Sequence, residues 1–139
     1  MTGGTATVSG LRVHRSVLDS VAVITLSGDL DAHSAAVVQT DVMAIMPAHS
    51  EVLLDLADVT HVTSAGLRTL LLIYRQGQCL DSAIALVGLS PELRGVLSAS
   101  GFLDFFRVVD SVADGVELLG REAAQRDTTQ RETRERVDA

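Results

Sequence analysis

The sequence has few aromatic residues and no long apolar run, and these absences exclude several classes of protein. It contains no Trp, one Tyr and three Phe, so few side chains are available to stack on the bases of a nucleic acid. The longest apolar runs, such as residues 70–73, are far shorter than the roughly 18 residues needed to cross a bilayer. No basic segment followed by an apolar one opens the chain. We therefore expect neither a membrane span nor a secretory signal.

The usual signatures of disulfide, metal and nucleotide chemistry are also missing. Cys79 is the single cysteine, which indicates a reducing compartment, and we take this to be the cytoplasm. The four histidines fall in separate predicted elements without the spacing of metal ligands. No glycine-rich phosphate loop follows a predicted strand. We therefore expect no metal, no cofactor and no nucleotide-dependent catalysis.

Lysine is absent, and all eleven basic residues are Arg, which together with abundant Ala, Val, Gly and Asp is typical of a GC-rich bacterial genome. The net charge of −7 is unevenly distributed. Residues 121–139 hold five Arg and five acidic residues, which leaves six Arg against thirteen acidic residues in residues 1–120. This acidity argues against a nucleic acid partner and favours a basic protein surface. Alternatively, it serves only to keep the protein soluble.

The apolar pattern predicts one α/β domain over residues 11–120, between a loose arm at residues 1–10 and a charged tail at residues 121–139. Strands are predicted at residues 11–17, 21–27, 52–56, 83–87 and 105–109. Helices are predicted at residues 34–46, 90–100 and from 111 onward, and another helix carries an apolar stripe from Leu67 to Tyr74. The first two strands form a hairpin, and the later alternation predicts a mostly parallel sheet with an antiparallel N-terminal edge and about four flanking helices. The tail either extends the last helix or is disordered.

The segment from Asp55 to Leu67 carries the strongest local signal for a functional site. It runs from a buried strand into a helix and places Ser64 at or near the helix N-cap. There the Ser64 hydroxyl would face solvent, and the helix dipole would accommodate a phosphate. The alternative is purely structural, because Ser is a common N-cap and Gly66 could serve only for close packing.

Asp58, His61 and Ser64 have the residue types of a hydrolase triad. Such triads come from distant elements, however, and Val62 stands where a nucleophile elbow needs Gly. We therefore expect no enzyme, although a hydrolase with Ser64 as nucleophile and His61 as base remains an alternative. Elsewhere, we expect Asp29 and Asp31 in an exposed loop after a strand that ends at Gly28.

Four short motifs in a fixed order resemble those of the STAS family, the fold of bacterial anti-sigma factor antagonists, across about residues 8–120. They are Leu26 to Asp31, Val52 to Leu56, Ser64 to Leu67, and Leu89 to Leu93 followed by Ser100 to Phe102. The resemblance implies a STAS fold and a regulatory protein that is not an enzyme. It also implies a partner, an anti-sigma factor or serine kinase of kinase-like ATPase fold. Binding would release the sigma factor, and the partner would inactivate the protein by phosphorylating Ser64.

The resemblance further implies a partner surface around the same turn. Its residues would be Asp29, Asp31, His61, Thr63, Ser64, Ala65, Gly66 and Arg68. A turn or helix-cap role is the alternative for the first two. Thr63 stands where these antagonists usually have Asp, and it is the second candidate for phosphorylation. The alternative function is a STAS docking subunit of a larger signalling or transport assembly without phosphorylation. Whether the protein forms a homodimer stays open.

Overall fold

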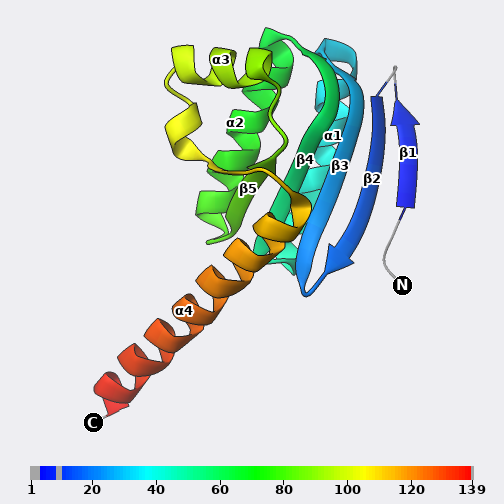
Figure 1. The fold of residues 1–139 in the computed structure, drawn as a ribbon. Helices are drawn as coiled ribbons and strands as arrows, with labels where there is room; N and C mark the ends of the chain where they lie inside the picture. Colours follow the sequence, from blue (N-terminus) through cyan, green and yellow to red (C-terminus); the bar gives the residue numbers. More distant parts are fainter. Residues whose placement is uncertain (1–3, 9–10, 139) are drawn as a thin grey trace.

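The computed structural model describes residues 4–8 and 11–138, and these residues form one six-stranded sheet with four α-helices (Figure 1). The strands are β1 (Gly4–Val8), β2 (Leu11–Leu18), β3 (Val21–Leu30), β4 (Glu51–Val62), β5 (Ala83–Val87) and β6 (Arg107–Val109). The helices are α1 (Ala32–Ile45), α2 (Ser64–Cys79), α3 (Pro91–Ala99) and α4 (Val112–Asp138), with 3-10 turns at Met46–Ala48 and Leu103–Phe105.

The order of strands in the sheet follows the chain from β1 to β6. The pairs β1–β2 and β2–β3 are antiparallel, and the pairs β3–β4, β4–β5 and β5–β6 are parallel. This arrangement confirms the predicted α/β class with a mostly parallel sheet and an antiparallel N-terminal edge.

The N-terminal hairpin is confirmed, and the sheet extends one strand beyond it. β2 and β3 are joined by Asp19 and Ser20, whose φ angles of 49° and 71° are those of the two-residue turn that matches the twist of a hairpin. The expected loose arm is wrong for Gly4–Val8, which pair with β2 along their whole length. Pairing of the backbone with an open strand edge overrides the loop-like composition here. The rest of that arm, residues 1–3, 9 and 10, lies outside the described residues.

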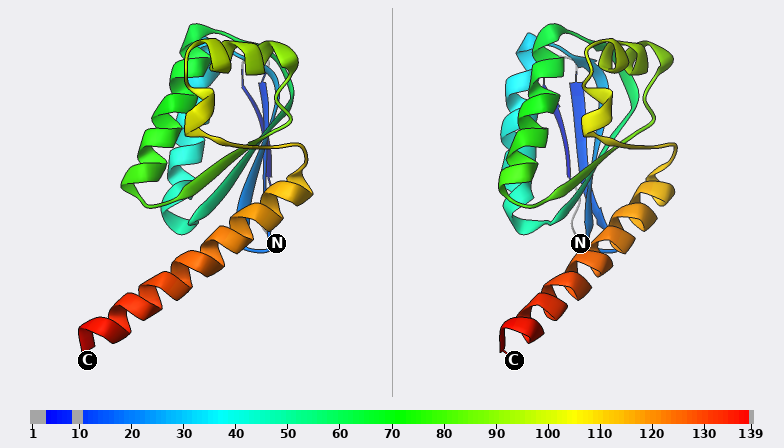
Figure 2. Two further views of the ribbon diagram at one scale, coloured as in Figure 1. Left: turned by 60° about the vertical axis from the view of Figure 1, so that its left-hand side comes forward. Right: turned by 90° about the vertical axis from the view of Figure 1, so that its left-hand side faces the viewer.

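Both faces of the sheet are covered by helices (Figure 2). On one face α1, α2 and α3 pack over a large core that includes Leu26, Leu54 and Leu70, each almost inaccessible to solvent. On the other face α4 covers a smaller core, in which Leu119 contacts a cluster that includes Val23 and Leu53. Because side chains alternate along a strand, β3 and β4 contribute to both cores.

α4 is one continuous helix that includes residues 121–138, the segment for which helix and disorder were both expected. Its first part packs on the sheet, and Glu122 forms an ion pair with Arg107 of β6 at 2.9 Å. Beyond that point the helix projects away from the rest of the molecule (Figure 1). Among the described residues, no helix combines the length and the apolar character that crossing a membrane would require.

Three strand boundaries differ from the sequence prediction by two residues or more. β3 reaches Leu30 and β4 reaches Val62, several residues past their apolar runs, because the two strands continue to pair through two register shifts. The last strand is shorter than expected: Phe105 belongs to a 3-10 turn and β6 begins at Arg107. The predicted caps of α3 are confirmed, since Ser90 accepts from the Leu93 N–H and Gly101 follows the helix with a φ of 79°.

Candidate functional site

The ends of β3 and β4 and the starts of α1 and α2 meet at one edge of the sheet. We call this edge the rim and define it by residues 28–31 and 60–66. Since β3 and β4 are parallel neighbours, both strands end here. The Thr63 N–H donates to the Leu30 carbonyl at 3.0 Å and connects the two segments. The rim therefore brings together the predicted motif around Asp29 and the predicted motif around His61. These two residues are 32 positions apart in the sequence.

Asp29 lies on β3 and pairs with two residues of β4, so the expected exposed loop is wrong for this residue. The Thr60 hydroxyl donates to Asp29 Oδ1 at 2.6 Å, and His61 Nδ1 lies 3.2 Å from the same oxygen. Both β4 residues reach one carboxylate because a register shift follows Gly28, whose φ is 113°. The hydrogen bond from Thr60, and then that from His61, holds the pKa of Asp29 below its ordinary value.

The side chains of Asp29 and His61 lie on the α4 side of the sheet. Leu30 and Val62, which follow Asp29 and His61 in their strands, belong to the core under α1, α2 and α3. Because successive side chains of a strand point to opposite faces, Asp29 and His61 face the other way. The pair remains accessible, with 52% of the Asp29 side chain and 75% of the His61 side chain exposed.

Asp31 is the N-cap of α1, which corrects the expected loop and confirms the helix-cap alternative. Its carboxylate accepts the backbone N–H groups of His33 at 2.9 Å and Ser34 at 3.2 Å. The Ser34 hydroxyl completes the capping box by accepting the Asp31 N–H at 3.1 Å, and it donates to the Asp29 carbonyl at 2.8 Å. One Asp31 oxygen is thus committed to holding the start of the helix.

Thr63, and not Ser64, is the N-cap of α2. The Thr63 hydroxyl accepts the Gly66 N–H at 3.4 Å, and its carbonyl accepts the Leu67 N–H at 2.9 Å. Ser64 is the first residue of the helix, and it is exposed. Ser64 was expected at or near the N-cap, and it directly follows the cap. Because Thr63 supplies the cap, the Ser64 hydroxyl does not have the structural role of a cap.

Ser64 lines an open groove between α1 and α2 on the opposite side of the rim from Asp29. The groove is formed by Ala32, Ala35, Ala36, Gln39, Ser64, Ala65, Arg68, Thr69 and Leu72. Its walls are mostly small residues, and Arg68 is the one charged side chain among them. Of the predicted site residues, the structure thus places Ser64, Ala65 and Arg68 together, while Asp29 and His61 form a separate group across the rim.

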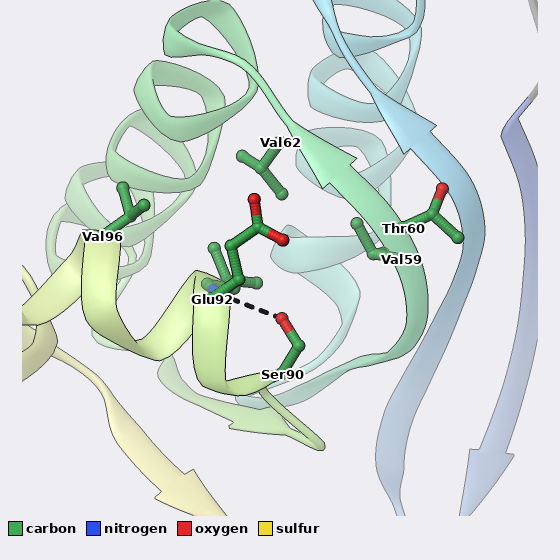
Figure 3. Close-up of a pocket in the computed structure, with 7 residues that line it drawn as sticks. Val59, Thr60, Val62, Ser90, Glu92 and Val96 are labelled. Atoms are coloured by element: carbon green, nitrogen blue, oxygen red, sulfur yellow. Dashed lines mark hydrogen bonds between the residues drawn. The ribbon is translucent and has the colours of Figure 1, made fainter.

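A second, much smaller cavity lies where the N-terminal end of α3 meets the end of β4 (Figure 3). It has a volume of about 30 Å³ and is lined by Val59, Thr60, Val62, Ser90, Glu92, Leu93 and Val96. This is room for about one water molecule. Thr60 lines this cavity and also bonds Asp29, a role that sequence reasoning missed. Its only sequence signal is a hydroxyl residue directly before His61.

The described residues contain no group of three or more His, Cys, Asp or Glu side chains arranged to hold a metal ion. The imidazole of His61 is paired with Asp29 through Nδ1. The acid of the hypothetical triad, Asp58, is exposed on β4.

Solved structures with the same fold belong to proteins with different described functions. An anti-sigma factor antagonist from Mycobacterium paratuberculosis aligns with a TM-score of 0.71 and 20% identity over 78% of this chain and 93% of its own. The phosphorylated form of SpoIIAA from Bacillus aligns with a TM-score of 0.61 and 17% identity, over 84% of this chain and 97% of its own. A sulfate transporter family protein from Wolinella succinogenes aligns with a TM-score of 0.67 and 20% identity, over 76% of this chain and 92% of its own. These likenesses establish the fold.

Sequence comparison goes further than the fold. BtrV of Bordetella bronchiseptica, which is named as an anti-sigma factor antagonist, is 30% identical over 95 residues, covering 68% of this chain and 82% of the relative. The sequence model of the STAS domain matches residues 12–115, which span β2 to the first turn of α4 and contain the whole rim. The chain belongs to the STAS domain family.

Proposed function

We propose that this protein is an anti-sigma factor antagonist, a non-catalytic regulator of transcription that acts in the cytoplasm of a bacterium. It binds an anti-sigma factor of kinase-like ATPase fold, and phosphorylation of Ser64 ends the binding. The observation that carries this proposal is the exposed position of Ser64 as the first residue of α2, beside an open groove. The identity of 30% to a relative named as an anti-sigma factor antagonist supports it.

A phosphate at Ser64 would change the surface and leave the fold intact. The partner would transfer the γ-phosphoryl group of ATP to Ser64 Oγ: the bond from the γ-phosphorus to the bridging oxygen breaks, ADP leaves, and the hydroxyl proton of Ser64 passes to water. The added charge of about −1.5 to −2 at pH 7 would lie at the N-terminal end of α2, where the helix dipole favours an anion. Thr63 caps the helix, so modification of Ser64 does not remove a cap. The phosphate would therefore act on whatever protein covers the rim.

The contact surface would have to extend across the rim. The Ser64 groove lies on the α1–α2 side, and the exposed Asp29–His61 pair lies on the α4 side. A partner that touches both must cover the edge between them, including Thr63. Asp31 would contribute mainly by fixing the start of α1, because one of its carboxylate oxygens is committed to the capping bonds.

The test begins with the intact mass of the protein isolated from its own host, which shows whether it carries a phosphate and, after fragmentation, at which residue. Affinity purification with wild type identifies the partner by mass spectrometry. Binding of that purified partner is then measured for wild type, Ser64→Ala and Ser64→Glu. We expect the Glu variant to bind more weakly by about 1 to 3 kcal/mol, and the Ala variant to bind and to resist phosphorylation.

Ser50→Glu is the matched control, because Ser50 is exposed and directly precedes β4 at the opposite edge of the sheet. It adds the same charge far from the rim and should bind as wild type does. Equal binding by wild type and Ser64→Glu would overturn the switch.

One observation favours a second candidate, a docking subunit of a larger signalling or transport assembly without phosphorylation. Thr63 supplies the cap of α2 but no charge beside Ser64, whereas an Asp there could help a kinase orient its substrate or metal. A sulfate transporter family protein shares the fold. Stable co-purification with a large assembly that neither Ser64 substitution affects would favour this candidate. Absence of labelling by a serine-hydrolase reagent would separately argue against an enzyme.

A further inference from the structure

Ser64 and Arg68 lie one helical turn apart at the start of α2. Both are exposed, and both line the groove between α1 and α2. Residues at positions i and i+4 of a helix are surface neighbours, and an acidic group on the N-terminal side of a basic one is the favourable order. Side chains also tilt toward the N-terminus of their helix, which directs Arg68 toward Ser64.

Arg68 is available for a new partner. Within the described part of the chain, ion pairs join Asp29 with His61, Arg107 with Glu122, and Glu117 with Arg121. Arg68 takes part in none of them. The residues of α1 that line the groove, Ala32, Ala35, Ala36 and Gln39, are uncharged.

The backbone at the start of α2 is less available to a phosphate than a free helix end would be. The Gly66 N–H already donates to the Thr63 hydroxyl, and the Leu67 N–H donates to the Thr63 carbonyl. The Thr63 N–H is occupied as well, because it donates to the carbonyl of Leu30, the residue before Asp31. A phosphate on Ser64 would thus find these amides at the helix start already occupied. Arg68 is the one charged side chain that lines the groove, and its guanidinium would add to the compensation that the helix dipole gives.

We propose that Arg68 binds the phosphate of phosphorylated Ser64 within the same chain. A guanidinium can donate two parallel N–H groups to phosphate oxygens, which a lysine ammonium cannot do in the same geometry. In the unmodified protein Arg68 is free to meet a carboxylate of the partner in the groove. Phosphorylation then acts twice, because it adds negative charge at the rim and removes the positive charge of the groove. This inference rests on the proposed function only for the kinase and the partner.

The test uses full-length protein with phosphoserine incorporated at position 64 during translation, so no kinase or partner is needed. The second protonation of the phosphate, which occurs near pH 6 in an unperturbed phosphoserine, is followed by phosphorus NMR. We expect Arg68 to lower the proton affinity of the phosphate roughly two- to fivefold, since ion pairing favours the charged form. Arg68→Gln should abolish this effect, and Arg68→Lys should retain part of it.

Arg75→Gln is the matched control. Arg75 is an exposed arginine of α2 that lies eleven residues, or roughly 16 Å, along the helix from Ser64. It should leave the titration unchanged. Proton–nitrogen spectra of each variant verify the fold, and in phosphorylated wild type the Arg68 Nε–H should exchange more slowly with water than in the unmodified protein.

Identical titrations for wild type and Arg68→Gln, with unchanged spectra, would overturn the proposal. That result would leave the proposed function standing, because the phosphate could still repel a partner directly. Conversely, a host protein that is never phosphorylated at Ser64 would overturn the switch while the measured ion pair remained.

Discussion

Gly66 in the first turn of α2 lies directly against the carbonyl group of Leu30 at the end of β3, and no side chain fits between them. A Cβ atom on Gly66 would come within 2.8 Å of Leu30 Cγ and closer still to the Leu30 carbonyl oxygen. That oxygen is held in place because it accepts the Thr63 N–H at 3.0 Å. Gly66 therefore allows α2 to begin against the end of β3, and this contact fixes the position of Ser64.

Replacing Gly66 by Ala should destabilise the protein. The added methyl group would meet backbone atoms of Leu30, which cannot rotate away as a flexible side chain would. Overpacking of this kind typically costs about 1 to 3 kcal/mol. Urea denaturation of wild type and variant measures the difference.

Gly95→Ala provides the control for that experiment. Gly95 lies inside α3, and a Cβ there would meet nothing within 4 Å. The better helix propensity of Ala should stabilise the variant by up to about 1 kcal/mol. If the two substitutions changed the stability equally, the close approach of α2 to Leu30 would be refuted.

Removing the cap of α2 should have a larger effect than removing the Ser64 hydroxyl. Thr63→Ala deletes the acceptor of the Gly66 N–H, and loss of such a cap costs about 0.5 to 2 kcal/mol. Ser64→Ala, at the exposed first position of the helix, should stay within about 0.5 kcal/mol of wild type. Thermal unfolding of the two variants in parallel distinguishes the roles, and a more destabilising Ser64→Ala would contradict the assignment of Thr63 as the cap.

Introducing an acid at position 63 distinguishes the effect of the helix cap from the effect of added negative charge. Thr63→Asp can accept the same N–H, and its carboxylate interacts favourably with the helix dipole. We expect its stability to equal or exceed that of wild type, as measured by the same thermal unfolding. A clear loss of stability would show that the rim does not tolerate a third acid beside Asp29 and Asp31.

The apolar pattern predicted most of the fold because the buried residues follow simple periods. β5 has the predicted bounds, and Ser90 with Pro91 correctly marked the start of α3. The pattern failed where strand pairing continues without apolar residues on both faces. Residues 57–61 of β4 are mostly exposed, yet they pair with β3. Backbone hydrogen bonding with a neighbouring strand leaves little trace in the sequence.

The candidate site was likewise predictable only where it depends on local sequence signals. The start of α2 was located to within one residue, since helix starts have clear sequence signals. The pairing of Asp29 with Thr60 and His61 was not foreseen, because it depends on a register shift between two strands distant in sequence. An unpaired Asp in a loop and a strand Asp facing a histidine look alike in one sequence.

The Asp29 carboxylate should titrate at a lower pH than an ordinary Asp, chiefly because of the Thr60 hydroxyl. A carboxylate whose pKa is lowered by folding favours the folded state above the unfolded-state pKa, and this contribution is lost as the pH falls through the folded-state pKa. The effect is thus fully present at neutral pH. It disappears only in acid, below the ordinary value of 3.8.

Carbon-detected NMR of the carboxyl groups measures the Asp29 pKa. Thr60→Val keeps the shape of the side chain but removes the donor, and the pKa of Asp29 should then rise toward its ordinary value. Thr60→Ser keeps the hydroxyl and should leave the pKa low. A pKa that is unaffected by Thr60→Val would show that the hydrogen bond at 2.6 Å does not control the carboxylate.

The two parts of α4 should contribute very differently to stability. Leu119 is fully buried in the core under α4, so Leu119→Ala should cost about 2 to 5 kcal/mol. Ending the chain after Gln125 keeps Leu119 and the ion pair of Glu122 with Arg107, and it removes the part of the helix that projects from the molecule. We expect that truncation to change the free energy of unfolding by less than about 1 kcal/mol, because exposed helix away from a core adds little. Urea denaturation of both proteins tests the difference. A truncated protein as unstable as Leu119→Ala would mean that residues 126–139 belong to the folding unit, contrary to the domain boundary near residue 120.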